Sequence, residues 1–198
     1  MTTAMRATRI GVLAIQGACR LHKTHLDALG VNYVEIVDSK GLEQIDGLIL
    51  PGGESGVMLK LIEAASLGHS LYEFIRTKPT WGICAGAILM AKSVRSPSQY
   101  SFGVLDIAIE RNAYGRQQES CEDRIDGFLV SFIRAPKIIE VGAQVVVKAR
   151  REMSPIWVES GQAIATTFHP ETSLEVPSPW HRRLVELAVV GRRKVEDC

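Results

Sequence analysis

Cysteine is scarce in this 198-residue chain. The four cysteines show neither a C-x-x-C pair nor the spacing of a metal site, and they are too few for a disulfide framework in a protein of this length. A reducing compartment suits this composition best. We therefore expect a cytoplasmic protein that needs no metal ion and no cofactor.

Long apolar runs and an excess of one charge are also missing. No apolar run reaches 18 residues, so no membrane-spanning helix is expected. Lys and Arg number 23 and Asp and Glu number 22, and the net charge of +1 gives no reason to expect a nucleic-acid or membrane partner. The first nine residues lack the apolar core of a signal peptide, but they also lack acidic residues, so a short transit sequence remains open.

The first half of the chain alternates short apolar runs with helical patterns. Strands are predicted at 9–15, 31–37, 48–50 and 80–83, and helices at 21–29, 57–65 and 71–75. This order predicts an α/β fold with a mainly parallel central sheet, whose ligands lie at the carboxyl ends of the strands. We expect one domain over 1–198, with flexible ends at 1–8 and 191–198.

The second half carries fewer helical patterns. Strands are predicted at 103–109, 127–133 and 141–148, the last with a bulge at Gly142, and a hairpin pairs 156–159 with 163–168. A final helix is predicted from Pro179, capped by Ser178, to Val190.

A Gly-x-Cys-x-Gly turn at 82–86 is the central motif. An apolar strand leads into it and a helical run at 87–92 follows, which is the pattern of hydrolases whose nucleophile sits in a tight elbow. The turn would hold Cys84 in a strained backbone conformation, and the helix start would favour a thiolate there. The backbone N–H of Ala85 would bind an oxyanion. A buried structural cysteine beside two packing glycines would give the same short pattern.

His169 has the sequence context of a base for Cys84. It follows an apolar strand, and Glu171 stands two residues later, so an extended H-x-E would place both side chains on one side of the backbone. This arrangement predicts a Cys-His-Glu triad. A histidine and a glutamate in a surface loop are the alternative. The other histidines are expected in the first helix (His22, His25), in a loop (His69) and at the start of the last helix (His181).

A glycine-rich loop, Pro-Gly-Gly-Glu-Ser, follows the third strand at 51–55. It lacks the lysine of a phosphate-binding loop, and Glu54 would repel a phosphate. A second oxyanion donor at Gly53 fits better, with Glu54 receiving a substrate ammonium group. An ordinary strand–helix turn is the alternative.

Two arginines follow apolar, strand-like stretches. An arginine fork is the natural partner of a carboxylate, so Arg111 and Arg134 are candidates for binding an acidic group of a substrate. Either of them would equally suit a structural ion pair.

Six motifs in this order give the chain a specific resemblance. They are I-G-V-L-A-I-Q-G (10–17), G-L-I-L-P-G-G-E-S (47–55), W-G-I-C-A-G (81–86), E-R-N-A-Y-G-R-Q (110–117), F-I-R-A-P (132–136) and F-H-P-E (168–171). Together they resemble the glutaminase subunits of pyridoxal 5′-phosphate synthase, the PdxT type of class I (triad) glutamine amidotransferases, over roughly residues 9–190. The resemblance implies the three-layer, flavodoxin-like fold of that class with a nucleophile elbow.

The resemblance also implies residue roles and a reaction. Cys84, His169 and Glu171 match the triad, and the glutamine-binding positions are matched by Gly52, Gly53, Glu54, Arg111, Ile133 and Arg134. The implied reaction converts L-glutamine and water to L-glutamate and ammonia. The ammonia would pass to a barrel-shaped synthase subunit in a large hetero-oligomer that makes pyridoxal 5′-phosphate. Gln16, at the end of the first strand, is expected to relay contact with that partner to the glycine-rich loop.

Three departures from the family pattern stand out. Gly56 and Ile83 each stand where the family usually has Thr, and the stretch 121–129 is several residues shorter. None of them removes a triad side chain. The first two bear on the oxyanion loop, and the third bears on a surface hairpin or a partner contact.

Three other functions remain as alternatives. One is an amidotransferase subunit for another acceptor, such as imidazole glycerol phosphate synthase, although the motifs at 110–117 and 132–136 argue against it. Another is a catalytically silent partner subunit, against which the intact triad argues. The last is a cysteine stress protein of related fold, which the elbow alone would allow but the His-Pro-Glu motif does not favour.

Overall fold

A mainly parallel β-sheet forms the middle layer of the protein. The computed structural model describes residues 7–111 and 120–196. Within these residues the spatial order of the main sheet is β10 (Val146–Arg151), β11 (Ser154–Ser160), β12 (Ala163–Thr166), β4 (Thr80–Ile83), β3 (Gly47–Leu50), β1 (Arg9–Leu13) and β2 (Asn32–Ile36). Strands from β12 to β2 pair in parallel, whereas β11 is antiparallel to both of its neighbours. The predicted parallel sheet and the 156–168 hairpin are therefore confirmed.

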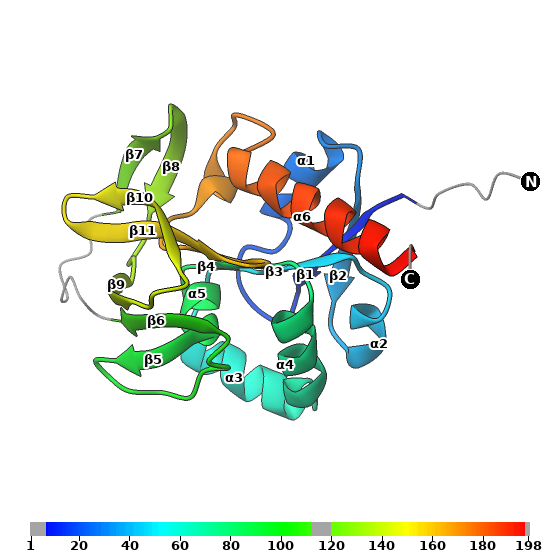
Figure 1. Ribbon diagram of the computed structural model, residues 1–198, viewed down its shortest axis with the longest axis horizontal. Helices are drawn as coiled ribbons and strands as arrows, with labels where there is room; N and C mark the ends of the chain where they lie inside the picture. Colours follow the sequence, from blue (N-terminus) through cyan, green and yellow to red (C-terminus); the bar gives the residue numbers. More distant parts are fainter. Residues whose placement is uncertain (1–6, 112–119, 197–198) are drawn as a thin grey trace, which may run out of the picture.

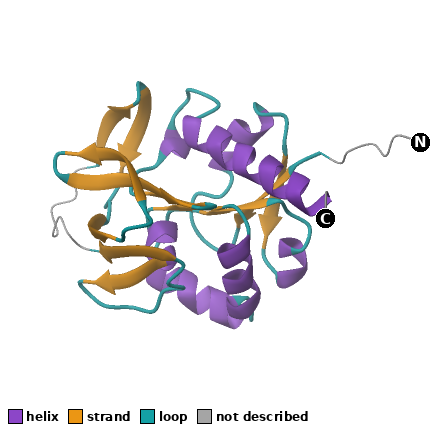
Figure 2. Ribbon diagram, viewed as in Figure 1, coloured by secondary structure: helices purple, strands orange, loops and turns teal. Residues whose placement is uncertain are grey.

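Helices cover both faces of this sheet. One face carries α1 (Leu21–Asp27) and α6 (Pro179–Glu196), and the other carries α2 (Ser39–Leu42), α3 (Ser55–Ala64), α4 (Gly68–Thr77) and α5 (Ala85–Met90) (Figure 1). Figure 2 shows the resulting sandwich of helix, strand and helix layers. This confirms the predicted three-layer α/β class. In the part of the chain that the structure describes, no helix has the length and apolar character that a membrane crossing needs.

Strand β1 shows why the central strands are apolar throughout. Ile10 and Val12 pack into the cluster under α1 and α6, whereas Leu13 packs into the cluster under the helices of the other face. All three side chains are fully buried. Because helices cover both faces, a central strand has no solvent-facing side, and its sequence loses the alternation of an exposed strand.

Two smaller sheets lie on either side of β10 and β11, one above and one below them in Figure 1. One comprises β5 (Ala91–Arg95), β6 (Leu105–Glu110) and β9 (Lys137–Val141), and the other is the hairpin of β7 (Cys121–Ile125) and β8 (Phe128–Phe132). The predicted strands at 103–109 and 127–133 thus exist with shifted ends. The stretch with the shortened sequence forms a hairpin whose strands are joined by only two residues, Asp126 and Gly127.

The strand predicted across Gly142 is wrong. The backbone N–H of Gly142 donates to the carbonyl of Asp106 at 2.7 Å, and a β-carbon on Gly142 would meet the Asp106 side chain at 2.0 Å. The chain therefore turns at Gly142 instead of bulging, and the segment divides into β9 and β10.

Three further predictions need correction. His69 lies in α4, not in a loop, and Ala91 ends α5 and starts β5, although a helical run to Lys92 was predicted. Helix α6 continues beyond Val190 to Glu196. In each case the local sequence allows either state, and packing with distant segments decides.

Candidate active site

Cys84 occupies the turn between β4 and α5. Its backbone has φ 48° and ψ −100°, a conformation that side chains rarely adopt, and its N–H donates to the carbonyl of Thr166 at 2.8 Å. The flanking glycines allow close contacts: a β-carbon on Gly82 would lie 2.6 Å from the carbonyl carbon of Gly86, and one on Gly86 would lie 2.1 Å from the carbonyl oxygen of Leu50. Cys84 is therefore held by its neighbours in a strained elbow.

His169 and Glu171 lie where the chain leaves β12. His169 precedes the short helix η1 (Pro170–Thr172), and its Nδ1 is 2.8 Å from Oε1 of Glu171. Backbone hydrogen bonds in both directions tie His169 to Ser131 of β8. Because β12 pairs directly with β4, these two side chains reach the edge of the sheet where Cys84 follows its strand.

The three side chains also interact electrostatically. Burial alone would lower the pKa of His169, but the Cys84 sulfur and the Glu171 carboxylate raise it to about 10. Burial alone would raise the pKa of Glu171, but its hydrogen bond with His169 and the nearby histidines lower it. Nε2 of His169 is buried and has no hydrogen-bond partner of regular geometry within the described residues, although His169 interacts with Cys84 electrostatically. The imidazole of His169 is therefore protonated at pH 7.

The glycine-rich loop packs directly against these groups. A β-carbon on Gly52 would lie 2.2 Å from Cε1 of His169, so only glycine leaves room for the ring. A β-carbon on Gly53 would lie 2.3 Å from Oε1 of Gln16, and the same oxygen accepts the N–H of Glu54 at 3.1 Å. The structure thus brings Gln16 and the loop together beside the imidazole.

Charged side chains form the rim of the site. Arg134 makes an ion pair with Glu54, and both side chains are about half exposed. The carbonyl oxygen of Ile133 lies 4.0 Å from Sγ of Cys84. Ala85, which follows the nucleophile candidate, is the first residue of α5. The sulfur thus lies near a backbone carbonyl, and the residue after that carbonyl is paired with the glycine-rich loop.

Arg111 approaches the same rim from the end of β6. A β-carbon on Gly56 would lie 3.8 Å from one of its terminal nitrogens, so the guanidinium lies over the start of α3. The rest of the predicted E-R-N-A-Y-G-R-Q motif, residues 112–117, lies outside the described residues. Ile83, which stands where the family usually has Thr, is fully buried in β4.

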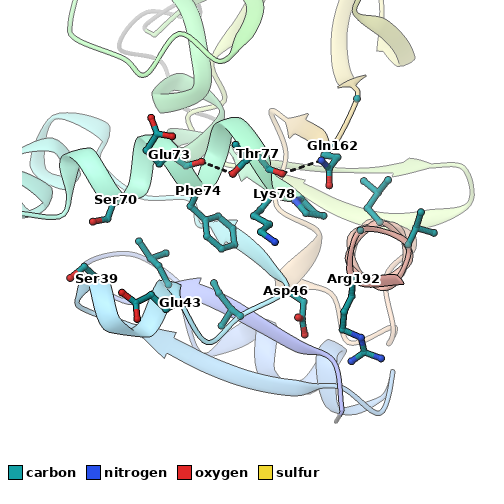
Figure 3. A pocket seen from close by; sticks show the side chains of 17 residues that line it. Ser39, Glu43, Asp46, Ser70, Glu73, Phe74, Thr77, Lys78, Gln162 and Arg192 are labelled. Carbon is teal, nitrogen blue, oxygen red and sulfur yellow. Dashed lines mark hydrogen bonds between the residues drawn. The ribbon is translucent and has the colours of Figure 1, made fainter. Parts of the chain in front are cut away.

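A separate pocket of about 990 Å³ lies at the opposite edge of the sheet, between α2, α4 and α6 (Figure 3). Its lining includes Asp46 and Lys78, which stand just before β3 and β4, whereas Cys84 follows β4. Of the candidate residues named above, none lines this pocket. Within the residues described, no group of three or more His, Cys, Asp and Glu side chains is arranged to hold a metal ion.

Comparison with known proteins identifies the family. Residues 12–186 match the sequence model of the SNO glutamine amidotransferase family. The chain belongs to this family. The family that the motifs at 10–17 and 168–171 helped to predict is thereby confirmed.

Individual relatives are similar over most of the chain. The pyridoxal 5′-phosphate synthase subunit PdxT of Koribacter versatilis is 46% identical over 169 residues, which cover 82% of this chain and 88% of the relative. PdxT of Thermotoga petrophila is 42% identical over 187 residues, which cover 90% of this chain and 98% of the relative. A crystal structure described as a glutamine amidotransferase superposes with a TM-score of 0.81 at 39% identity, over 90% of this chain and 98% of that one.

One group of polar residues near the candidate active site was not recognised from the sequence. Ser178 and three histidines lie together behind Glu171, namely His22, His25 and His181. A usable signal was the spacing of His22 and His25, which places both on one face of a helix. The sequence around these two histidines does not indicate their contact with α6, which lies more than 150 residues away along the chain.

Proposed function

We propose that this protein hydrolyses L-glutamine to L-glutamate and ammonia and supplies the ammonia for synthesis of pyridoxal 5′-phosphate. The observation that carries this function is the set of Cys84, His169 and Glu171, assembled at the carboxyl edge of the sheet. The chain's membership of the SNO family and its likeness to PdxT subunits over most of both chains support the same reaction.

The three triad side chains divide the chemistry. The sulfur of Cys84 attacks the side-chain amide carbon of glutamine, and His169 gives a proton to the departing ammonia. A water molecule, deprotonated by the same imidazole, then releases glutamate from the thioester. Glu171 holds the imidazole by its Nδ1 and stabilises its positive charge.

Backbone groups beside the sulfur stabilise the charge that develops on the substrate oxygen. The N–H groups of Ala85 and Gly53 are the oxyanion donors in this proposal. Preorganised donors of this kind strengthen their hydrogen bonds most in the transition state, where the oxygen carries most charge.

The rim residues recognise the amino-acid end of glutamine. Glu54 receives the ammonium group, and Arg111 and Arg134 bind the carboxylate, while Gly52 and the Ile133 carbonyl contribute backbone contacts. The ion pair of Arg134 with Glu54 supports this division, because a zwitterion can replace each partner by a group of the same charge.

The ammonia is handed to a separate barrel-shaped synthase subunit in a cytoplasmic hetero-oligomer. Coupling between the two proteins runs through Gln16, which contacts both Gly53 and Glu54. A partner pressing on this loop would reorient the N–H of Gly53. Because losing one oxyanion donor costs about 10²- to 10³-fold in kcat, such a movement accounts for strong activation.

The test is glutamate release from glutamine, with and without a pyridoxal 5′-phosphate synthase subunit. Wild type is compared with Cys84→Ala, and Cys121→Ala on the peripheral β7 serves as the matched control. We expect turnover in wild type and in the control, and none in Cys84→Ala despite an unchanged circular dichroism spectrum. Turnover in Cys84→Ala would refute the triad. No turnover in wild type with the synthase bound would identify a silent partner subunit instead.

A further inference from the structure

Three histidines that the proposed mechanism does not use are buried behind the triad. His22 and His25 belong to α1, and His181 lies in the first turn of α6; each is at most 1% exposed. The rings of His25 and His181 stack with centroids 4.3 Å apart. Burying polar rings is unfavourable unless they are hydrogen-bonded, so this cluster calls for a role.

Hydrogen bonds join the cluster into a chain. Nδ1 of His22 lies 2.9 Å from Nε2 of His181, and Nδ1 of His181 lies 2.6 Å from Oγ of Ser178. Burial lowers the pKa of His22 to about 4 and that of His181 well below its usual value. Both rings are therefore neutral at pH 7, and each carries a single N–H.

Glu171 lies beside the His22 end of this chain. Within the described residues, Nε2 of His22 and Oε2 of Glu171 are both buried and have no hydrogen-bond partner. The two side chains nevertheless interact electrostatically, and α1 packs against η1. Nε2 of His22 can carry a proton and Oε2 of Glu171 belongs to a carboxylate, so the two atoms suit each other as hydrogen-bond donor and acceptor.

The charge of Glu171 decides which way the chain is polarised. With the proton of His22 on Nε2, its Nδ1 accepts from Nε2–H of His181, and Nδ1 of His181 accepts from the Ser178 hydroxyl. Every bond then has one donor and one acceptor. The opposite direction would turn a lone pair of His22 toward the carboxylate and would leave the Ser178 hydroxyl proton unused.

We infer that His22 is a positioning residue for the triad: its Nε2–H faces Oε2 of Glu171 and keeps Oε1 turned toward His169, while Ser178 and His181 fix the tautomer that makes this possible. The inference rests on the proposed function, since it assigns a supporting role within that triad. Because hydrogen bonds in a chain polarise one another, the whole row stabilises the carboxylate.

His25 contacts the main chain of the same residue. Its Nδ1 accepts the backbone N–H of Ser178 at 3.1 Å, so its proton is on Nε2, which is hydrogen-bonded to the backbone of Glu171. One face of α1 thus holds Glu171 twice, with His25 at the main chain and His22 at the carboxylate. This explains why two histidines stand three residues apart on a buried helix face.

The experiment compares His22→Leu, which removes the N–H, with His22→Gln, which retains an N–H on a side chain of similar reach. Losing a hydrogen bond to a charged group lowers kcat for glutamine hydrolysis by about 10- to 100-fold in His22→Leu. KM should stay within about twofold, because His22 does not touch the substrate, and His22→Gln should recover most of kcat. The control Leu26→Ala, on the same helix and fully buried, should lower the melting temperature without changing kcat of the folded enzyme.

A second measurement separates this inference from the proposed function. The rate of Cys84 labelling by iodoacetamide needs no glutamine, and we expect it to fall in His22→Leu and to recover in His22→Gln. If His22→Leu does not fold, Ser178→Ala removes only the hydroxyl at the end of the chain and should slow both reactions several-fold. Wild-type rates in His22→Leu, or equal losses in His22→Leu and His22→Gln, would overturn the inference even if the glutaminase itself is active.

Discussion

The side-chain amide of Gln16 lies against the α-carbon of Gly53. A β-carbon on Gly53 would come within 2.3 Å of Oε1 of Gln16, and that oxygen also accepts the N–H of Glu54 at 3.1 Å. A β-carbon on Gly17, the residue after Gln16, would meet the Gly52 carbonyl of the same loop at 2.0 Å. The end of β1 and the loop after β3 therefore cannot move independently.

This contact predicts how the protein responds to its synthase partner. Under the proposed coupling, Gln16→Ala removes the relay to Gly53, so addition of a synthase subunit should raise kcat at least tenfold less than it does in wild type. The measurement is a titration of synthase at saturating glutamine, with binding followed separately. Gln44→Ala, an exposed change after α2, should behave as wild type. Full activation of Gln16→Ala would show that the contact transmits nothing.

The triad geometry predicts unequal effects at its two supporting members. His169→Ala removes the group that transfers protons, whereas Glu171→Gln leaves the imidazole in place and removes only the charge beside it. We expect kcat to fall at least tenfold further in His169→Ala than in Glu171→Gln. Steady-state kinetics at saturating glutamine make this comparison. Wild-type kcat in Glu171→Gln would remove Glu171 from the triad.

The rim arginines should act on binding. In the proposed function Arg134 binds the substrate equally in the ground state and the transition state, so in Arg134→Ala KM should rise by about tenfold or more while kcat changes little. Arg111→Ala is expected to behave in the same way. Arg95→Ala, which breaks an exposed pair with Glu140, is the matched control and should leave both constants unchanged. A fall in kcat at constant KM would assign these arginines to another role.

The buried histidines predict a loss of stability in mild acid. Burial lowers the pKa values of His22, to about 4, and of His25 and His181 below the usual 6.5, partly offset by the Glu171 carboxylate at His22 and His25. Between pH 6.5 and 4 the unfolded chain therefore binds protons that the folded chain excludes. The free energy of unfolding should fall as pH falls, by up to about 1.4 kcal/mol per pH unit for each histidine.

Urea unfolding at pH 7 and at pH 5 measures this effect. His181→Phe should reduce the difference between the two conditions, whereas a change at exposed His69 should not. His169 acts in another window: its pKa is raised to about 10, so its contribution is complete below pH 6.5 and is lost as the pH rises through 10. Equal stability at pH 7 and pH 5 would contradict the buried, neutral state of the cluster.

The elbow and the parallel sheet were predictable because their signals are local. A short apolar run followed by glycines around Cys84 is compatible with few structures other than a strand that ends in a tight turn. The apolar run before His169 likewise has few possible structures other than a strand. Strand β5 was not predictable, because nothing in its sequence excludes a longer helix. It forms because Ala91 and its neighbours pair with β6, starting opposite Leu105.

The contacts between distant segments explain the remaining differences. The histidine chain joins α1 to α6, and each histidine taken alone fits an ordinary helix position. Arg111 is a second case in which the sequence alone is insufficient. The sequence indicates that this arginine binds a carboxylate, but it does not distinguish a substrate carboxylate from the partner in a structural ion pair. Its place above the start of α3 depends on how β6 leaves its sheet.

The contact of Gly86 with the Leu50 carbonyl limits how this scaffold can be redesigned. Because the helix that follows Cys84 touches the strand that leads into the glycine-rich loop, one added methyl group at Gly86 would push Cys84 away from that loop, which holds the proposed oxyanion donor Gly53. The floor of the site therefore tolerates almost no change in volume. Engineering toward another amide substrate has to start from the rim, where Arg111 and Arg134 can be exchanged without displacing the backbone beneath them.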